Sequence, residues 1–211
     1  MKGLLRKDFM LQKKDSLILW GVFTLLYLFS ALFRSNASFL ISVAQTTSVI
    51  MAVSLSMNIF SLDDACKWNI YALSLPVGRR LLVGARYVYL SLMTLALCVY
   101  SFLGVMLTVR SGWQEFFWAH LSFYSLSLVM IALICPTVYR FGTHDARILL
   151  VVLTLFFALL LIQIDLSPLT VPKFDLQGGV PLQGIFFAVS AAVLLLSYAL
   201  SCRILERHDV R

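Results

Sequence analysis

The sequence predicts an all-α integral membrane protein with one transmembrane domain over residues 1–211, and three observations support this fold class. Hydrophobic residues fill 61% of the 211 positions and charged residues only 13%, whereas an average soluble domain carries about 25% charged residues. Uncharged runs such as 16–33 and 87–109 are long enough to cross a bilayer core of about 30 Å. Because backbone groups in lipid must be satisfied within the segment, each crossing is expected to be a helix.

Six spans are expected along the chain, at about 16–33, 39–62, 82–109, 116–139, 148–164 and 184–204. The first apolar run is too long for a signal peptide, so we expect it to remain as a span. Pro136 is expected to kink or end the fourth span. The connection 165–183 is rich in Pro and Gly, and irregular backbone of this kind is tolerated only in water or under a protein cover.

The positive residues predict the orientation. Fourteen Lys and Arg fall in the N-terminal segment, the two even-numbered loops and the tail, namely Lys2, Arg6, Lys7, Lys13, Lys14, Lys67, Arg79, Arg80, Arg86, Arg140, Arg147, Arg203, Arg207 and Arg211. The other side holds three, Arg34, Arg110 and Lys173. Positive residues are retained in the cytoplasm, so both termini are predicted to be cytoplasmic.

Several function classes are disfavoured. The chain lacks GxSxG, HExxH and GxxxxGK[ST] strings, so we expect no enzyme activity, no metal and no nucleotide bound by this chain itself. The net charge of +7 is explained by anionic lipid headgroups, without nucleic acid. Arg86 is expected to snorkel to the headgroups. His120 is interpreted as an interfacial histidine beside Trp113 and Trp118, with a proton relay as the alternative.

The N-terminal stretch 1–15 has apolar residues (Leu4, Leu5, Phe9, Met10, Leu11) and basic ones (Lys2, Arg6, Lys7, Lys13, Lys14). This pattern fits an amphipathic helix in the plane of the membrane interface. The alternative is a simple positive flank of the first span, because the apolar face is not clean.

The loop Asp63–Arg80 carries a second helical pattern. Asp63 or Asp64 is expected to cap a helix start, and Pro76 to end it. Between them Trp68, Tyr71, Ala72 and Leu75 recur at helical spacing. Such a short amphipathic helix suits docking into a groove of a partner, or anchoring at headgroup level.

The second span carries polar side chains on one face. Thr47, Met51, Ser54 and Asn58 lie at offsets of four, seven and eleven residues, which places them together on a helix. Polar residues in spans usually form hydrogen bonds between helices. The other interpretation is that this face lines a translocation pathway.

The opening MKGLLRKDFMLQKKD and the string WNIYALSLPVGRR resemble the small ABC-2 type permeases of bacteria. These begin with a similar segment and carry an acidic pair, a Trp and a Y-x-x-S-L-P-[IV]-x-R-like string after the second span. The matching positions here are Asp63, Asp64, Trp68, Tyr71, Ser74, Leu75, Pro76, Val77 and Arg79. Within this group the chain looks most like membrane subunits of exporters of amphipathic cytolytic peptides, the phenol-soluble modulin type.

The resemblance implies a type V ABC exporter fold in the bacterial plasma membrane, with an N-terminal elbow helix, six spans and a coupling helix in loop 63–80. It implies separate ATPase subunits that bind ATP and Mg, and a second copy of the chain or a related permease. The ATPase-coupling residues would be Asp64, Trp68, Tyr71, Leu75, Pro76 and Arg79. The translocation pathway would include Thr47, Met51, Ser54 and Asn58, and the cargo would be a peptide. Rival functions are an immunity factor that binds a peptide and an accessory subunit of a sensor complex.

Overall fold

The computed structural model describes residues 2–32, 37–68, 71–72, 78–108, 113–163 and 182–207. The regular structure in these ranges is helical, and no strand occurs within them. The long helices are α1 (Lys2–Leu32), α2 (Ala37–Ala65), α4 (Arg79–Thr108), α5 (Trp113–Gln163) and α6 (Leu182–Arg207). The predicted all-α class is therefore confirmed for the described part of the chain.

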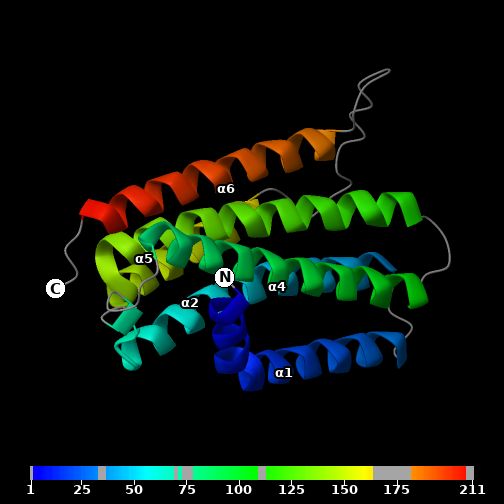
Figure 1. Cartoon of the computed structure of the whole chain (residues 1–211). Helices are drawn as coiled ribbons and strands as arrows, with labels where there is room; N and C mark the ends of the chain where they lie inside the picture. Colours follow the sequence, from blue (N-terminus) through cyan, green and yellow to red (C-terminus); the bar gives the residue numbers. More distant parts are fainter. Residues whose placement is uncertain are drawn as a thin grey trace.

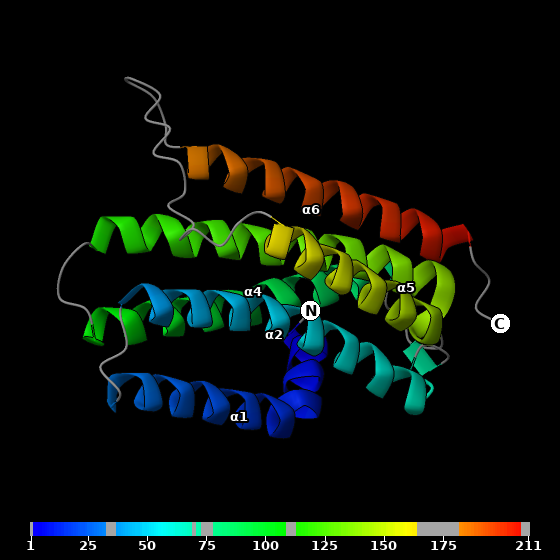
Figure 2. The same ribbon diagram turned by 180° about the vertical axis from the view of Figure 1, so that it is seen from behind.

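The helices form a bundle in which α5 is central. It packs against α2, α4 and α6, and α1 packs against α2 and α4. Figures 1 and 2 show α4, the first part of α5 and α6 running side by side along the bundle. The core between them is built from apolar side chains of α2, α4 and α5, among them Ile59, Phe60, Val83, Leu90, Ile131 and Ile134.

Among the described residues, three helical segments are long and apolar enough to cross a membrane: Arg79–Met106, Phe116–Ile148 and Gln183–Glu206. They coincide with the third, fourth and sixth predicted spans. The first and second predicted spans lie in α1 and α2, and the fifth lies in the last part of α5. The side chains of 149–163 are outside the described residues. Six spans therefore remain a prediction.

The break between the fourth and fifth predicted spans lies at Gly142. Its φ of 84° and ψ of 173° interrupt the helical backbone of α5, and glycine adopts a positive φ without a steric penalty. Pro136 lies inside helical backbone six residues earlier, so the helix does not end at Pro136, and a local kink there stays a prediction. The chain reverses where a glycine permits the turn.

The predicted boundary between an N-terminal helix 1–15 and a first span does not interrupt the helix, because α1 is assigned as one helix from Lys2 to Leu32. It does change direction: in Figures 1 and 2 its first part runs across the bundle, and the remainder runs along it. Phe9 and Met10 are exposed, whereas Asp8 and Gln12 are buried. Leu5 packs against the core beside them, so the face that this first part turns toward the bundle is mixed, with buried polar side chains as well as an apolar one.

Hydrogen bonds between side chains join the apolar helices. The Tyr87 hydroxyl lies 2.7 Å from Ser197 Oγ and 2.8 Å from Ser201 Oγ, and Ser197 donates to the carbonyl oxygen of Ala132 at 2.5 Å. All three side chains are buried. This network ties α4, α5 and α6 together, as polar residues in membrane bundles commonly do.

Candidate functional site

The first candidate site follows directly after α2. Helix α2 continues through Ala65, so Asp63 and Asp64 lie in its last turn, and the prediction that one of them caps the next helix is wrong. The backbone then turns at Lys67, whose φ is 50°, a left-handed conformation that is uncommon for residues other than glycine. Helical backbone resumes at Trp68, and Tyr71 and Ala72 are helical too.

Trp68 and Tyr71 lie next to each other, as their spacing indicates. Their ring centroids are 5.5 Å apart with an interplanar angle of 47°. Trp68 is half-buried, and Tyr71 is 58% exposed. The pair therefore presents an aromatic surface at the end of the bundle. Leu75 and Pro76, the other apolar members of the predicted set, lie outside the described residues.

Asp64 and Arg79 bond within the chain. Thr143 Oγ1 donates to Asp64 Oδ2 at 2.6 Å, which attaches the turn after Gly142 to the end of α2. Arg79 Nη1 donates to the carbonyl oxygen of Leu205 at 3.2 Å, near the end of α6. A cation at the C-terminal end of a helix stabilises it, because the last carbonyls lack helical partners. These bonds fix both ends of loop 63–80 to neighbouring helices.

A cluster of four charged side chains lies beside this loop. It consists of Lys7, Asp8, Asp63 and Arg86. Lys7 Nζ lies 2.7 Å from Asp63 Oδ1 and 3.4 Å from Asp8 Oδ1. The Arg86 guanidinium binds Asp8 at 3.0 Å and also contacts Asp63. The side chains of Arg86, Asp8 and Asp63 are 7%, 5% and 3% exposed. Arg86 therefore pairs inside the protein, and the prediction that it snorkels to the headgroups is wrong.

The charges in the cluster balance, with two cations and two anions. This matters because a buried charge is tolerated only when it is paired and hydrogen-bonded. Gln12 extends the polar interior: its Nε2 donates to the carbonyl oxygen of Leu55 at 2.7 Å, and its Oε1 accepts from the Tyr89 hydroxyl at 2.8 Å. The cluster joins α1, α2 and α4 by polar contacts.

Lys7 also contacts the aromatic pair. Its Nζ lies 3.8 Å from the centroid of the Trp68 ring, which is within the range of a cation–π interaction. Burial, and after it the nearby Arg86, lowers the pKa of Lys7 to about 8, and the Asp8 carboxylate opposes this shift. The Lys7 ammonium therefore links the buried cluster to the exposed loop.

The second candidate site, the polar face of α2, is described only in part. Ser54 is exposed and Asn58 is half-buried, and Ile50, one turn before Ser54, is 58% exposed. This stripe faces away from the core that Leu55 and Ile59 fill on the same helix. The side chains of Thr47 and Met51 lie outside the described residues. The structure thus leaves Ser54 open at the surface of the single chain.

Comparison with known proteins decides the family. A family model described as ABC-2 family transporter protein matches residues 3–206. The chain belongs to this family. Together with its three apolar helices, membership makes it a multi-pass membrane protein of the transporter class. A search of curated proteins found no match.

His120 of this ABC-2 family protein is a packing residue in the structure. Its Nδ1 lies 2.8 Å from the Phe116 carbonyl oxygen, and its Nε2 lies 3.0 Å from Ser101 Oγ. Because a carbonyl oxygen only accepts, Nδ1 must carry a proton. Ser101 then donates to Nε2 and joins α4 to α5. His120 is 4% exposed, so its imidazole packs inside the bundle, and its position at the depth of the membrane interface stays a prediction.

The sequence analysis missed the buried cluster in this transporter protein. A signal was present: Asp8, Gln12 and Ser16 recur every four residues and therefore share one helix face. All three are buried. Leucines and lysines lie on either side of them, so the local pattern indicates an amphipathic helix at the interface, not a polar stripe that faces the interior.

Proposed function

We propose that this chain is the transmembrane permease subunit of an ATP-driven exporter in the bacterial plasma membrane. The observation that carries the proposal is the Trp68–Tyr71 pair, of which Tyr71 is exposed, in a chain matched to the ABC-2 family over residues 3–206. The chain lacks a phosphate-binding loop, so ATP is hydrolysed by a separate ATPase subunit. The aromatic pair, with Leu75 and Pro76, docks on that subunit, and Asp64 and Arg79 hold the loop in place.

The spans form an alternating-access pathway. Six helices cross the membrane, and the first part of α1 acts as the elbow. The permease works as a dimer with a second copy or a related subunit. Thr47, Met51, Ser54 and Asn58 border the pathway, because Ser54 is open at the surface of the single chain. A weakly polar face suits amphipathic or hydrophobic peptides better than ions.

Co-purification with an ATPase tests the function. An ATPase subunit encoded beside this chain should co-purify with it in detergent, and its ATP turnover should rise when an amphipathic peptide is added. An immunity factor would instead protect cells from the peptide without any ATPase, and a sensor accessory subunit would co-purify with a kinase. Protection without ATPase binding would overturn the exporter assignment.

The predicted orientation can be checked by thiol labelling. Cys66 is exposed in the structure, so burial does not prevent its reaction. Because it follows α2 on the Lys- and Arg-rich side, Cys66 should resist an impermeant maleimide in intact cells and react in inverted vesicles. A cysteine placed at Asn36 or Ser111 should show the opposite pattern. Labelling of Cys66 in intact cells would show that the orientation in the membrane is opposite to the predicted one.

The pathway residues can be tested by leucine substitution. Thr47→Leu, Ser54→Leu and Asn58→Leu should each reduce peptide export while the complex with the ATPase stays assembled. Loss of assembly would favour interhelical hydrogen bonds, worth about 0.6 kcal/mol each on average. Thr24→Leu is a matched control, because Thr24 is exposed on α1 and its Oγ1 donates to the Gly21 carbonyl of its own helix. It should leave export unchanged.

A further inference from the structure

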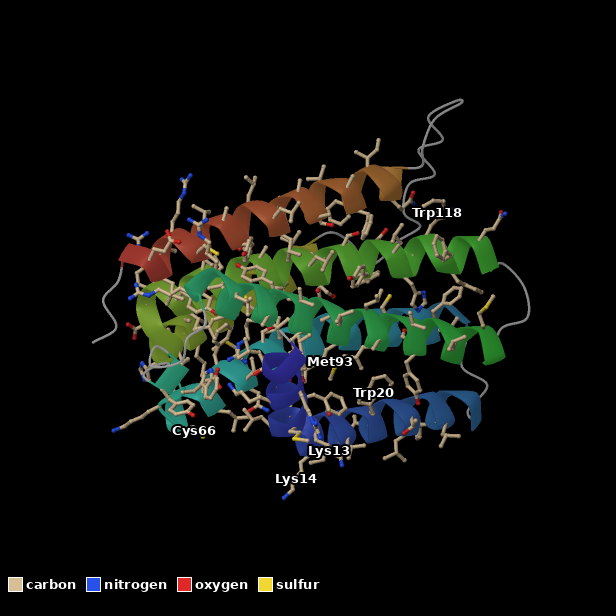
Figure 3. All side chains as sticks on the ribbon, viewed as in Figure 1. Lys13, Lys14, Trp20, Cys66, Met93 and Trp118 are labelled. Carbon is tan, nitrogen blue, oxygen red and sulfur yellow. The ribbon has the colours of Figure 1, made fainter. Side chains whose placement is uncertain are left out.

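The first part of α1 reaches the loop after α2 through one side chain. Lys7 contacts three partners from three segments: Asp8 on its own helix, Asp63 on the last turn of α2, and the Trp68 ring beyond the turn. Arg6, beside it in sequence, is exposed, as are Lys13 and Lys14. Figure 3 shows Lys13 and Lys14 pointing away from the bundle. Lys7 therefore differs from Arg6, Lys13 and Lys14, which lie exposed in the same segment.

At the start of the loop, the contact with Lys7 adds to the bonds that the backbone itself makes. The last helical bonds of α2 are followed by a turn at Lys67 with a φ of 50°. Cys66 N and Lys67 N donate to the carbonyl oxygens of Leu62 and Asp64 at 3.1 Å, and Tyr71 N donates to the Lys67 carbonyl oxygen at 3.4 Å, which is longer than the usual 2.7–3.2 Å. These bonds hold the backbone, whereas the Lys7 ammonium and the Tyr71 ring contact the Trp68 ring itself.

The first part of α1 is in turn firmly fixed. Asp8 pairs with Arg86 of α4, and Gln12 bonds to the Leu55 carbonyl of α2 and to Tyr89 of α4. Figures 1 and 2 show this part of the helix lying across the bundle. It thus forms a rigid support to which Lys7 ties the loop.

We propose that the first part of α1 positions the ATPase-coupling loop, with the Lys7 ammonium holding the Trp68 ring in the orientation that docks. Lys7 is a positioning residue, because it acts on the ATPase through Trp68. The inference rests on the proposed function for the role of Trp68, but the contact itself is tested on the chain alone. Movement of the docked loop passes through Lys7 and Asp63 to α1, α2 and α4.

The groups that face Lys7 make this contact pH-dependent. They are the carboxylates of Asp8 and Asp63, the guanidinium of Arg86 and, more distantly, the thiol of Cys66. With the pKa of Lys7 lowered to about 8, raising the pH from 7 to 9 removes the ammonium proton. The cation–π contact with Trp68 is then lost, since only the charged form is attracted to the ring.

A fluorescence titration tests the contact. The chain retains Trp68 as its one tryptophan, with Trp20, Trp113 and Trp118 changed to Phe, and carries Cys66→Ser so that the thiol near Trp68 is absent. Trp68 emission should change with a midpoint near pH 8. Lys7→Arg should remove the transition, because guanidinium stays charged, and Arg6→Gln should leave it intact. A transition that persists in Lys7→Arg, or its absence in the parent chain, would overturn the proposal.

The ATP turnover of the complex with the ATPase tests whether the Lys7–Trp68 contact matters for coupling. Lys7→Met together with Asp63→Asn removes one cation and one anion, so the remaining Asp8–Arg86 pair stays balanced. The ATPase should still co-purify, and its peptide-stimulated turnover should fall roughly two- to fivefold, the range expected for loss of one partly exposed cation–π contact. Lys7→Arg should retain most of the stimulation, and Lys13→Met should behave as wild type.

A double-mutant cycle separates positioning from general stability. Trp68→Leu should lower stimulated turnover, and adding Lys7→Met with Asp63→Asn should lower it little further, because the ring that Lys7 holds is already gone. If Trp68→Leu and the Lys7→Met, Asp63→Asn pair each lowered turnover by the same factor alone and in combination, the proposal would be overturned. Failure of the wild-type chain to bind any ATPase would overturn the proposed function instead, and the titration on the chain alone would still decide the Lys7–Trp68 contact.

Discussion

Arg86→Met should destabilise the protein by about 3–5 kcal/mol, the typical cost of removing one partner from a buried ion pair. Arg86 pairs with both Asp8 and Asp63, and all three side chains are almost fully buried. Without the guanidinium, two buried carboxylates would share Lys7 as their partner within the cluster. We expect a large fall in the thermal midpoint in detergent and a loss of monodisperse protein on gel filtration.

A paired control shows whether charge balance is the cause. Arg86→Met combined with Asp63→Asn leaves Lys7 and Asp8, one cation and one anion, and should recover much of the lost stability. Arg80→Met should have little effect, because the Arg80–Glu206 pair is solvent-exposed and exposed pairs are screened by water and salt. If Arg86→Met and Arg80→Met had the same thermal midpoint, the cluster would not stabilise the fold.

The double variant Trp68→Ala, Tyr71→Ala should release the ATPase subunit or uncouple its ATP turnover from transport. The two rings lie 5.5 Å apart, so they can enter one groove of a partner together. Aromatic anchors at an interface hot spot cost roughly 2 kcal/mol or more each when truncated. Pull-down of the ATPase and peptide-stimulated ATP hydrolysis measure the effect.

Insertion and abundance of this variant should stay close to wild type, because Tyr71 is mostly exposed and the pair contributes little to the core. If the two rings instead anchor the loop at headgroup level, the double variant should be less stable in the membrane and should bind the ATPase normally. Phe141→Ala provides a comparison, because Phe141 is also an exposed aromatic residue, on α5. If the double variant binds the ATPase and transports normally, loop 63–80 is not the coupling element.

The tertiary structure changed the interpretation of single residues more than that of whole segments. The local sequence predicts that Asp63 or Asp64 caps a helix in a loop and that Arg86 reaches the headgroups. Each prediction followed from the local sequence, where neither residue has an obvious partner. The two residues lie 23 positions apart and meet only because α2 and α4 pack together with the first part of α1. Spacing within one helix cannot reveal such a pairing.

The sequence by itself determined the helical class and the positions of three apolar helices, because composition and the length of uncharged runs decide what can lie in lipid. It also placed Trp68 beside Tyr71, because residues three apart lie one above the other on a helix. Only the tertiary structure decided which charges are buried and which side chains support the loop. Burial of a charge depends on the partners that other helices bring to it, and those partners are set by packing.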